Sequence, residues 1–176
     1  VAKAGMETGV ATRPMADLAA YKAKLDSSVF RSAMLMRPVF EAAKSASRRI
    51  VFAEGEDERV LRASQAIMEE TTEVPILIGR PEVIEARCER FGLPIRPGVD
   101  FQVVNPENDP RYREYWETYH ALMERRGVTP DVAKAVLRTN TTAIAAVMVH
   151  RGDADTMVCG AFGQPLWHLN YVRQIL

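Results

Sequence analysis

The segment Arg48–Arg62 constrains the fold most strongly, because a short apolar run passes directly into a helical pattern. The run Ile50–Ala53 is followed by an acidic turn that contains a single glycine. From Val60 onward, apolar residues recur every three or four positions, as in an amphipathic helix. This order predicts a strand–turn–helix unit, the building block of an α/β sheet. Folds of this class place ligand chemistry at the turn that follows such a strand.

The turn after this strand is unusual because it is crowded with carboxylates: Glu54, Glu56, Asp57 and Glu58. A helix N-terminus attracts anions, and nucleotide-binding folds place glycines there so that phosphate can approach. Since negative charge already occupies this position, the sequence argues against a phosphate-binding loop. We interpret the acids as helix caps with solvated charge, and we keep cation binding or orientation of a base as the alternative.

Further alternation of apolar runs and helical patterns predicts a mostly parallel sheet with helices on both faces, a three-layer α/β/α fold. A stripe of aromatic residues at helical spacing after Pro110 is expected to pack in the core. The expected strands are Arg49–Glu54, Val74–Ile78, Phe101–Val104 and Asp155–Ala161. The expected helices are Val29–Ala46, Arg59–Glu70, Pro81–Phe91, Pro110–Arg126, Thr129 to about Leu137, and Thr141–His150.

Composition and motif spacing exclude several functions. Lys plus Arg equals Asp plus Glu at 23 each, so the electrostatic driver of nucleic-acid binding is missing. No window has the length of a membrane span or the pattern of a signal peptide, which predicts a cytoplasmic protein without a membrane partner. The two cysteines and three histidines have no metal-ligand spacing, so no metal site is expected. The chain starts without methionine and ends on an apolar helical run, and we interpret it as a fragment of a longer polypeptide.

Three places remain as candidates for ligand contact. Arg80 follows the second strand at the edge that lines the crevice of α/β folds, where a plain surface arginine is an equal alternative. Arg125 and Arg126 follow the aromatic helix, where cations also simply complement the helix dipole. Gly160 and Gly163 lie in the loop after the fourth strand, where glycines let the backbone approach a ligand. Cys159 in this loop is interpreted as a packed thiol, because no base for a nucleophile is visible nearby.

Several of these segments resemble the phosphate acetyltransferase family: residues 49–63 (RIVFAEGEDERVLRA), 75–81 (PILIGRP) and 153–161. More closely, the chain resembles the C-terminal part of large bacterial NADP-dependent malic enzymes, in which a phosphotransacetylase-like domain follows the catalytic domains. Val1–Pro14 resembles the end of that catalytic portion, and Trp167-His168-Leu169 resembles these enzymes' version of the last loop. The resemblance implies an isocitrate/isopropylmalate dehydrogenase-like fold. It also implies that residues 1–28 end the catalytic portion and its linker, and that residues 29–176 form the first half of the phosphotransacetylase-like domain.

The chain departs from active phosphotransacetylases at two positions. The family carries an arginine where Met123 aligns, and a second one in a Leu-Arg-Pro motif where this chain has Asn170. In the family both arginines face the phosphate and the acyl group, and further catalytic groups lie in the second half of the domain. Loss of these charge-assisted contacts predicts that this segment contains no catalytic residues.

The resemblance therefore implies a regulatory segment that binds acetyl-CoA as an allosteric effector within a homo-oligomer. The expected effector contacts are Arg80, Arg125, Arg126, Gly160, Gly163 and Asn170. The parent enzyme would convert malate to pyruvate and CO2 with NADP and Mg2+ or Mn2+, and the segment itself would hold no cofactor. Two alternatives stay open: an active phosphate acetyltransferase, and a purely structural assembly domain that pairs through helix 110–126 or helix 141–150.

Overall fold

The computed structural model describes residues 8–9, 17, 21, 31–46, 48–71 and 73–176. The chain divides into two units, Val1–Ser45 and Ala46–Leu176. In the described part of the first unit, helix α3 (Arg31–Ser45) contains Pro38 in its interior. The boundary predicted between residues 28 and 29 lies outside the described residues. The sheet and the candidate site both belong to the second unit.

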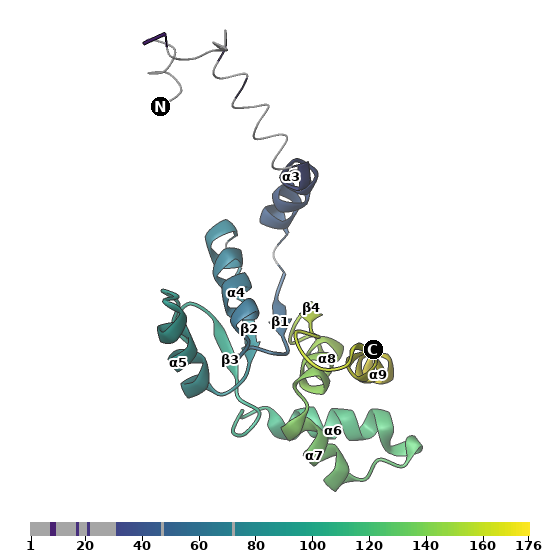
Figure 1. The fold of residues 1–176 in the computed structure, drawn as a ribbon. Coiled ribbons are helices and arrows are strands. Elements are labelled where there is room, and N and C mark those ends of the chain that lie inside the picture. Colours follow the sequence, from purple (N-terminus) through teal and green to yellow (C-terminus); the bar gives the residue numbers. More distant parts are fainter. Residues whose placement is uncertain (1–7, 10–16, 18–20, 22–30, 47, 72) are drawn as a thin grey trace. The chain divides into compact units, whose positions relative to one another are not determined.

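The second unit is built on a four-stranded parallel sheet with the order β3-β2-β1-β4 (Figure 1). Val51 of β1 pairs with Ile76 on one side and with Met157 on the other. The parallel sheet predicted from the sequence is confirmed, but each strand is shorter than expected. The strands are β1 (Ile50–Phe52), β2 (Ile76–Ile78), β3 (Gln102–Val104) and β4 (Thr156–Val158).

Three helices of this unit begin at a residue whose side chain caps them. Asp57, Thr129 and Asn140 each accept a hydrogen bond from a backbone N–H of the first turn that follows. The aromatic helix is shorter than predicted, because its last residues tighten into the 3-10 turn η1 (Glu124–Arg126) before Gly127. The helices are α4 (Glu58–Glu70), α5 (Pro81–Phe91), α6 (Tyr112–Met123), α7 (Pro130–Thr139), α8 (Thr141–Arg151) and α9 (Pro165–Ile175).

Alternate residues of the central strands point to two separate cores, which confirms the three-layer arrangement. Val51 and Ile76 pack with buried residues of α6, α7, α8 and α9. Phe52 and Leu77 pack with buried residues of α4 and α5. This division follows from the period of two in a strand, which sends neighbouring side chains to opposite faces.

Helix α8 is the most completely buried of the described helices in this unit. All residues from Thr142 to Met148 are buried, as expected for a small-residue helix packed under the sheet. Among the described residues no single helix has the length and apolarity to cross a membrane, and α7 with α8 does so only as a pair bent by 106°.

Candidate ligand-binding pocket

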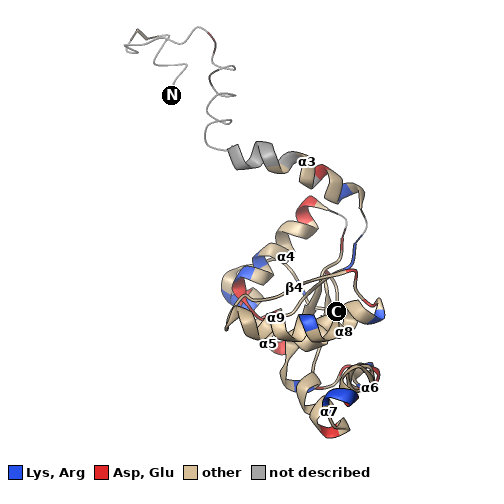
Figure 2. Ribbon diagram, turned by 90° about the vertical axis from the view of Figure 1, so that its right-hand side faces the viewer, with Lys and Arg blue, Asp and Glu red and all other residues tan. Residues whose placement is uncertain are grey.

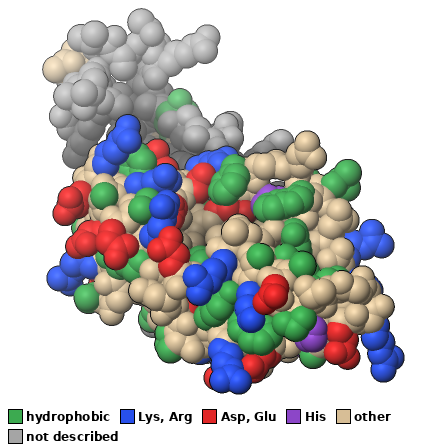
Figure 3. Space-filling view, turned by 90° about the horizontal axis from the view of Figure 1, so that it is seen from below, with side chains coloured by type: hydrophobic (Ala, Val, Ile, Leu, Met, Phe, Trp, Pro, Cys, Tyr) green, Lys and Arg blue, Asp and Glu red, His purple; other side chains and the backbone are tan. Residues whose placement is uncertain are grey.

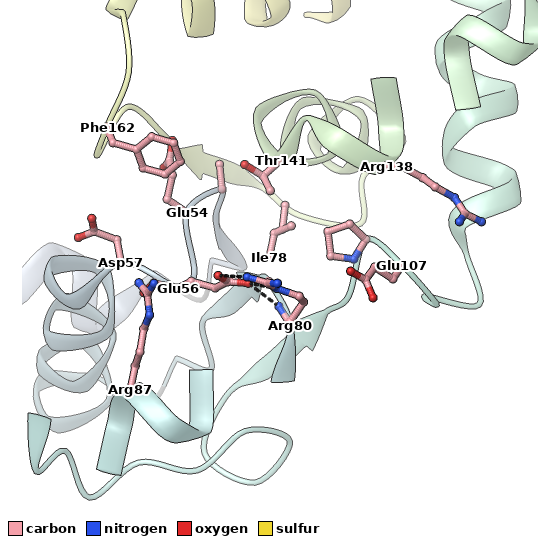
Figure 4. Close-up of a pocket in the computed structure, with 13 residues that line it drawn as sticks. Glu54, Glu56, Asp57, Ile78, Arg80, Arg87, Glu107, Arg138, Thr141 and Phe162 are labelled. Carbon is pink, nitrogen blue, oxygen red and sulfur yellow. Dashed lines mark hydrogen bonds and ion pairs between the residues drawn. The ribbon is translucent and has the colours of Figure 1, made fainter. Parts of the chain in front are cut away.

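A pocket of about 430 Å³ lies at the carboxyl ends of β1, β2 and β3 (Figure 4). This is the edge at which open parallel sheets bind ligands, and the volume falls in the range of small-molecule sites. The first wall is formed by the β1–α4 turn, the second by the start of α5, and the third by the α7–α8 junction. The lining residues are Ala53, Glu54, Glu56, Asp57, Ile78, Gly79, Arg80, Arg87, Pro106, Glu107, Arg138, Thr141 and Phe162.

The β1–α4 turn crosses very close to the end of β2, and Gly55 makes this possible. Its N–H donates to the carbonyl of Ile78 at 3.0 Å. A Cβ on Gly55 would stand 2.8 Å from the Ile78 carbonyl oxygen and 2.8 Å from Leu77 Cβ, so no larger residue fits. The crossing places Glu54 and Glu56 on different sides of the turn, as Figure 4 shows.

Glu56 forms a two-pronged ion pair with Arg80. Arg80 Nε lies 2.9 Å from Glu56 Oε1, Arg80 Nη2 lies 3.0 Å from Glu56 Oε2, and the Arg80 N–H donates to the same carboxylate at 3.0 Å. The hydrogen bonds from Arg80 hold the pKa of Glu56 below its usual range, although partial burial opposes the shift. Arg87 also donates to the Glu56 carbonyl from α5.

Asp57 and Glu58 of the same turn also form ion pairs. Asp57 caps α4 and pairs with the Arg59 guanidinium, whose hydrogen bonds lower the pKa of Asp57. Glu58 pairs with Arg62 along the helix. The predicted capping is therefore confirmed for Asp57. The expectation of solvated charge is wrong for Glu54, which is only 5% exposed.

Glu54 belongs to a buried polar cluster that the sequence analysis missed. Its Oε1 accepts from the N–H of Gly160 at 2.9 Å and lies 3.6 Å from Nδ1 of His168, which is 4% exposed. The same Nδ1 lies 2.7 Å from the hydroxyl of Thr142, and His168 Nε2 lies 2.7 Å from the carbonyl of Phe162. The cluster joins β1, α8, α9 and the loop after β4. No local pattern signals it, because its members are up to 114 positions apart, from residue 54 to residue 168.

Of the predicted effector contacts, Arg80 lines this pocket. Arg125 and Arg126 are exposed in η1, and Asn170 is exposed on α9, so these three lie outside the lining. Gly160 and Gly163 belong to the loop after β4, with φ of 94° and 87°, values that favour glycine. This loop contributes Phe162 to the pocket wall.

Arg87 and Arg138 are pocket cations that the sequence analysis did not select. Neither makes an ion pair with a carboxylate in the part of the chain that the structure describes. Arg138 stacks over the Tyr112 ring at 4.8 Å, and Figure 4 shows its guanidinium turned away from Glu54 and Phe162. Arg87 can be anticipated only from the sheet topology, since it lies on α5 opposite the β1–α4 turn.

The two positions at which the resemblance implies a lost arginine, Met123 and Asn170, also lie apart from the pocket. Met123 is 4% exposed and packs in the core formed with α7 and α8. Its sulfur lies 4.0 Å from Arg126 Nη1. Asn170 is exposed to solvent on α9. The residues that now occupy these positions therefore do not supply polar groups to the pocket.

The two free cysteines, Cys88 and Cys159, lie outside the pocket lining. Burial, together with nearby Glu54, raises the pKa of the Cys159 thiol, and burial raises that of Cys88. A raised pKa disfavours the reactive thiolate, as expected for packed thiols. Among the described residues, no group of three or more His, Cys, Asp or Glu side chains is arranged to hold a metal ion.

Charge on this unit is mixed rather than gathered by sign. Figure 2 shows both basic and acidic residues on α4 and on α7. Figure 3 shows basic, acidic and apolar side chains interleaved on one face. The pocket is lined by a few charged side chains and by apolar residues, and no broad field of one sign surrounds it.

A parallel α/β sheet with a pocket at its carboxyl edge defines an α/β domain with a candidate ligand site, and comparison with known proteins identifies its family. The profile described as "Phosphate acetyl/butaryl transferase" matches residues 34–176. The chain belongs to this phosphate acetyl/butyryl transferase family. A crystal structure of a phosphotransacetylase from Streptococcus pyogenes superposes with a TM-score of 0.69 at 26% identity, covering 80% of this chain and 42% of that one.

Two further relatives extend the similarity to nearly every residue of the chain. An NAD-dependent malic enzyme of Rhizobium meliloti is 58% identical over 100% of this chain, and an NADP-dependent malic enzyme of Escherichia coli is 49% identical over 99%. The chain spans 23% of the length of each of these two proteins. The chain thus matches a phosphotransacetylase-like part of proteins that carry the name malic enzyme.

Proposed function

We propose that the second unit is a non-catalytic regulatory module that binds acetyl-CoA in the pocket at the carboxyl edge of the sheet. One observation carries this proposal: the carboxyl edge of the sheet, where open parallel sheets bind ligands, has an open pocket, and neither residue 123 nor residue 170 lines it. Met123 is buried in the core and Asn170 faces solvent. A ligand that binds in a pocket without catalytic groups can still have different affinities for two conformations of the protein. This difference in affinity is sufficient for allostery.

The choice of acetyl-CoA rests on the chemistry in the relatives' names. A phosphotransacetylase transfers an acetyl group between CoA and phosphate, so an inherited pocket would accept the same thioester. The pocket volume of about 430 Å³ suits one portion of this long ligand. Arg80, Arg87 and Arg138 line the pocket and are the first candidates for contact. Arg125, Arg126, Gly160, Gly163 and Asn170 remain proposed contacts for parts of the ligand that extend beyond it.

The parent polypeptide would be a cytoplasmic, homo-oligomeric malic enzyme that oxidises malate to pyruvate and CO2 with NAD or NADP. Support comes from relatives of that name at 58% and 49% identity. The residues that hold the nicotinamide cofactor and Mg2+ or Mn2+ would lie in a different portion of that polypeptide. We also propose that the second unit has an isocitrate/isopropylmalate dehydrogenase-like fold.

Steady-state malate oxidation by the full-length protein, measured with increasing acetyl-CoA, tests this function. We expect a saturable change in the malate kinetics, and no acetyl phosphate formation from acetyl-CoA and inorganic phosphate. Unchanged malate kinetics at saturating acetyl-CoA would contradict the regulatory role. CoA-dependent acetyl phosphate turnover would instead support the active transferase that the sequence left open.

A second candidate, an assembly role, is favoured by the exposed apolar surface of α9. Leu166 is 71% exposed, Trp167 46% and Leu169 45%. The helices proposed for pairing from the sequence are poor candidates, because α8 is buried within the unit and α6 directs Tyr115 and Tyr119 into the core. Replacing Leu166 and Leu169 by Ser should then lower the oligomeric state measured by light scattering. An unchanged mass would count against assembly through α9.

A further inference from the structure

The loop after β4, residues 159–164, is held by three hydrogen bonds from three different elements. The N–H of Gly160 donates to Glu54 at the end of β1. The carbonyl of Ala161 accepts from Arg59 of α4. The carbonyl of Phe162 is bonded by His168 of α9 at 2.7 Å. Residues 160, 161 and 162 are therefore hydrogen-bonded to the β1–α4 turn, to α4 and to α9, respectively.

The bond from His168 has a defined direction. A carbonyl oxygen only accepts, so Nε2 carries the proton and donates to Phe162. On the other side of the ring, Nδ1 lies 2.7 Å from the hydroxyl of Thr142, which is completely buried in α8. This second bond fixes the plane of the ring. Thr142 thereby orients His168, and His168 orients the loop.

Phe162 connects this tether to the pocket. Its side chain is 62% exposed and lines the pocket, and Figure 4 shows the ring beside Glu54. Gly160 and Gly163 flank this part of the loop with positive φ. A Cβ on Gly163 would stand 3.3 Å from His168 Nε2, so the loop approaches the imidazole closely.

We propose that His168 is a positioning residue that couples the pocket to helix α9. It holds the Phe162 wall in place, and an occupant that shifts Phe162 changes the hydrogen bond that joins the loop to α9. Trp167 and Leu169, the chain neighbours of His168, are exposed on α9, so the change reaches an apolar surface about one helical turn long. This inference rests on the proposed function for its ligand, acetyl-CoA, and adds the route by which binding is transmitted.

Amide hydrogen exchange on the full-length protein, with and without acetyl-CoA, tests the tether and the coupling separately. His168→Leu and His168→Asn remove the donor to Phe162, whereas His168→Gln keeps an amide N–H near the position of Nε2. Without ligand, we expect exchange in residues 160–163 to rise about fivefold to tenfold in the first two variants. The Gln variant should stay near wild type. Leu169→Ala, on the same helix with no bond to the loop, is the matched control.

With acetyl-CoA, we expect slower exchange in residues 160–163 and in residues 167–170 of the wild type. In His168→Leu the protection of residues 167–170 should be lost while the loop remains protected. Equal protection of α9 in wild type and His168→Leu, or equal loop exchange without ligand, would overturn the inference and leave the proposed function intact. If acetyl-CoA does not bind the wild type, the proposed function and the coupling both fail, while the ligand-free comparison still decides the tether.

Phe162→Ala provides a second, independent variant, because its backbone carbonyl and all three loop bonds remain. We expect about threefold to tenfold weaker acetyl-CoA binding with unchanged loop exchange in the free protein. Unchanged affinity would show that the Phe162 side chain does not contact acetyl-CoA, and would rule out this coupling route. This result stays interpretable even if His168→Leu fails to fold.

Discussion

Glu56 and Arg80 form an ion pair that locks the turn after β1 to the start of α5. The two side chains meet through distances of 2.9 and 3.0 Å, and the Arg80 backbone N–H adds a third bond. Because both residues line the pocket, the pair sets the shape of one wall. The pair also partly neutralises the charge of Arg80, an expected effector contact for which a plain surface arginine was the equal alternative.

Replacing Glu56 by Gln should flatten the acid side of the stability–pH profile. The pKa of Glu56 is lowered in the folded protein by its hydrogen bonds to Arg80. The stabilisation is therefore fully present above the ordinary glutamate pKa and is lost as the pH falls through the lowered one. Urea unfolding midpoints measured across the acidic range should decline less in Glu56→Gln than in wild type. Glu85→Gln, an exposed change on α5, serves as control, and a profile identical to wild type in Glu56→Gln would contradict the prediction.

Gly55→Ala should be much more damaging than Gly79→Ala. The new Cβ at position 55 meets the Ile78 backbone oxygen at 2.8 Å, which cannot move without breaking the sheet edge. At position 79 the nearest atom is Glu56 Cγ at 2.9 Å, part of a side chain that can shift. We expect a loss of about 3 kcal/mol for Gly55→Ala and about 1 kcal/mol for Gly79→Ala, from denaturant unfolding. Equal losses of unfolding free energy in the two variants would contradict the close approach of Gly55 to the end of β2.

Arginine at the two positions where the resemblance implies one should have different consequences for stability. Met123→Arg places a charge in the core, at a position where the methionine sulfur lies 4.0 Å from Arg126 Nη1, and should cost about 3 kcal/mol. Asn170→Arg is made on an exposed helix position and should be close to neutral. Thermal or urea unfolding of the two variants gives the comparison. A stable Met123→Arg protein would mean that position 123 can reach solvent or the pocket.

The main elements of the fold were predictable from local patterns. The run Ile50–Ala53 before an amphipathic helix, the proline in the first turn of α5 and α7, and the small-residue helix α8 each have a direct structural counterpart. Strand ends were overestimated because apolar residues such as Val74 continue beyond the hydrogen-bonded ladder and are exposed there. Hydrophobic periodicity indicates which residues of a strand are buried, but it does not indicate where the hydrogen-bonded pairing with the next strand ends.

The pocket was only partly predictable. The position of Arg80 at the carboxyl edge was predictable, because this edge of a parallel sheet follows from the order of strands and turns. The cluster of Glu54, Thr142 and His168 was missed, because its partners meet only through the packing of α8 and α9 against β1. Arg87 and Arg138 were missed for the same reason: they reach the pocket from helices whose rotation the sequence does not specify.

The most direct test of the central claim is calorimetric titration of the full-length protein with acetyl-CoA, repeated for a variant whose pocket is filled. Thr141→Trp places an indole into the pocket from the first turn of α8, and Ala135→Trp places one on the exposed surface of α7, outside it. We predict saturable binding in wild type and Ala135→Trp, and binding at least about tenfold weaker in Thr141→Trp. Absence of saturable binding in wild type, or undiminished affinity in Thr141→Trp, would contradict the assignment of this pocket to acetyl-CoA.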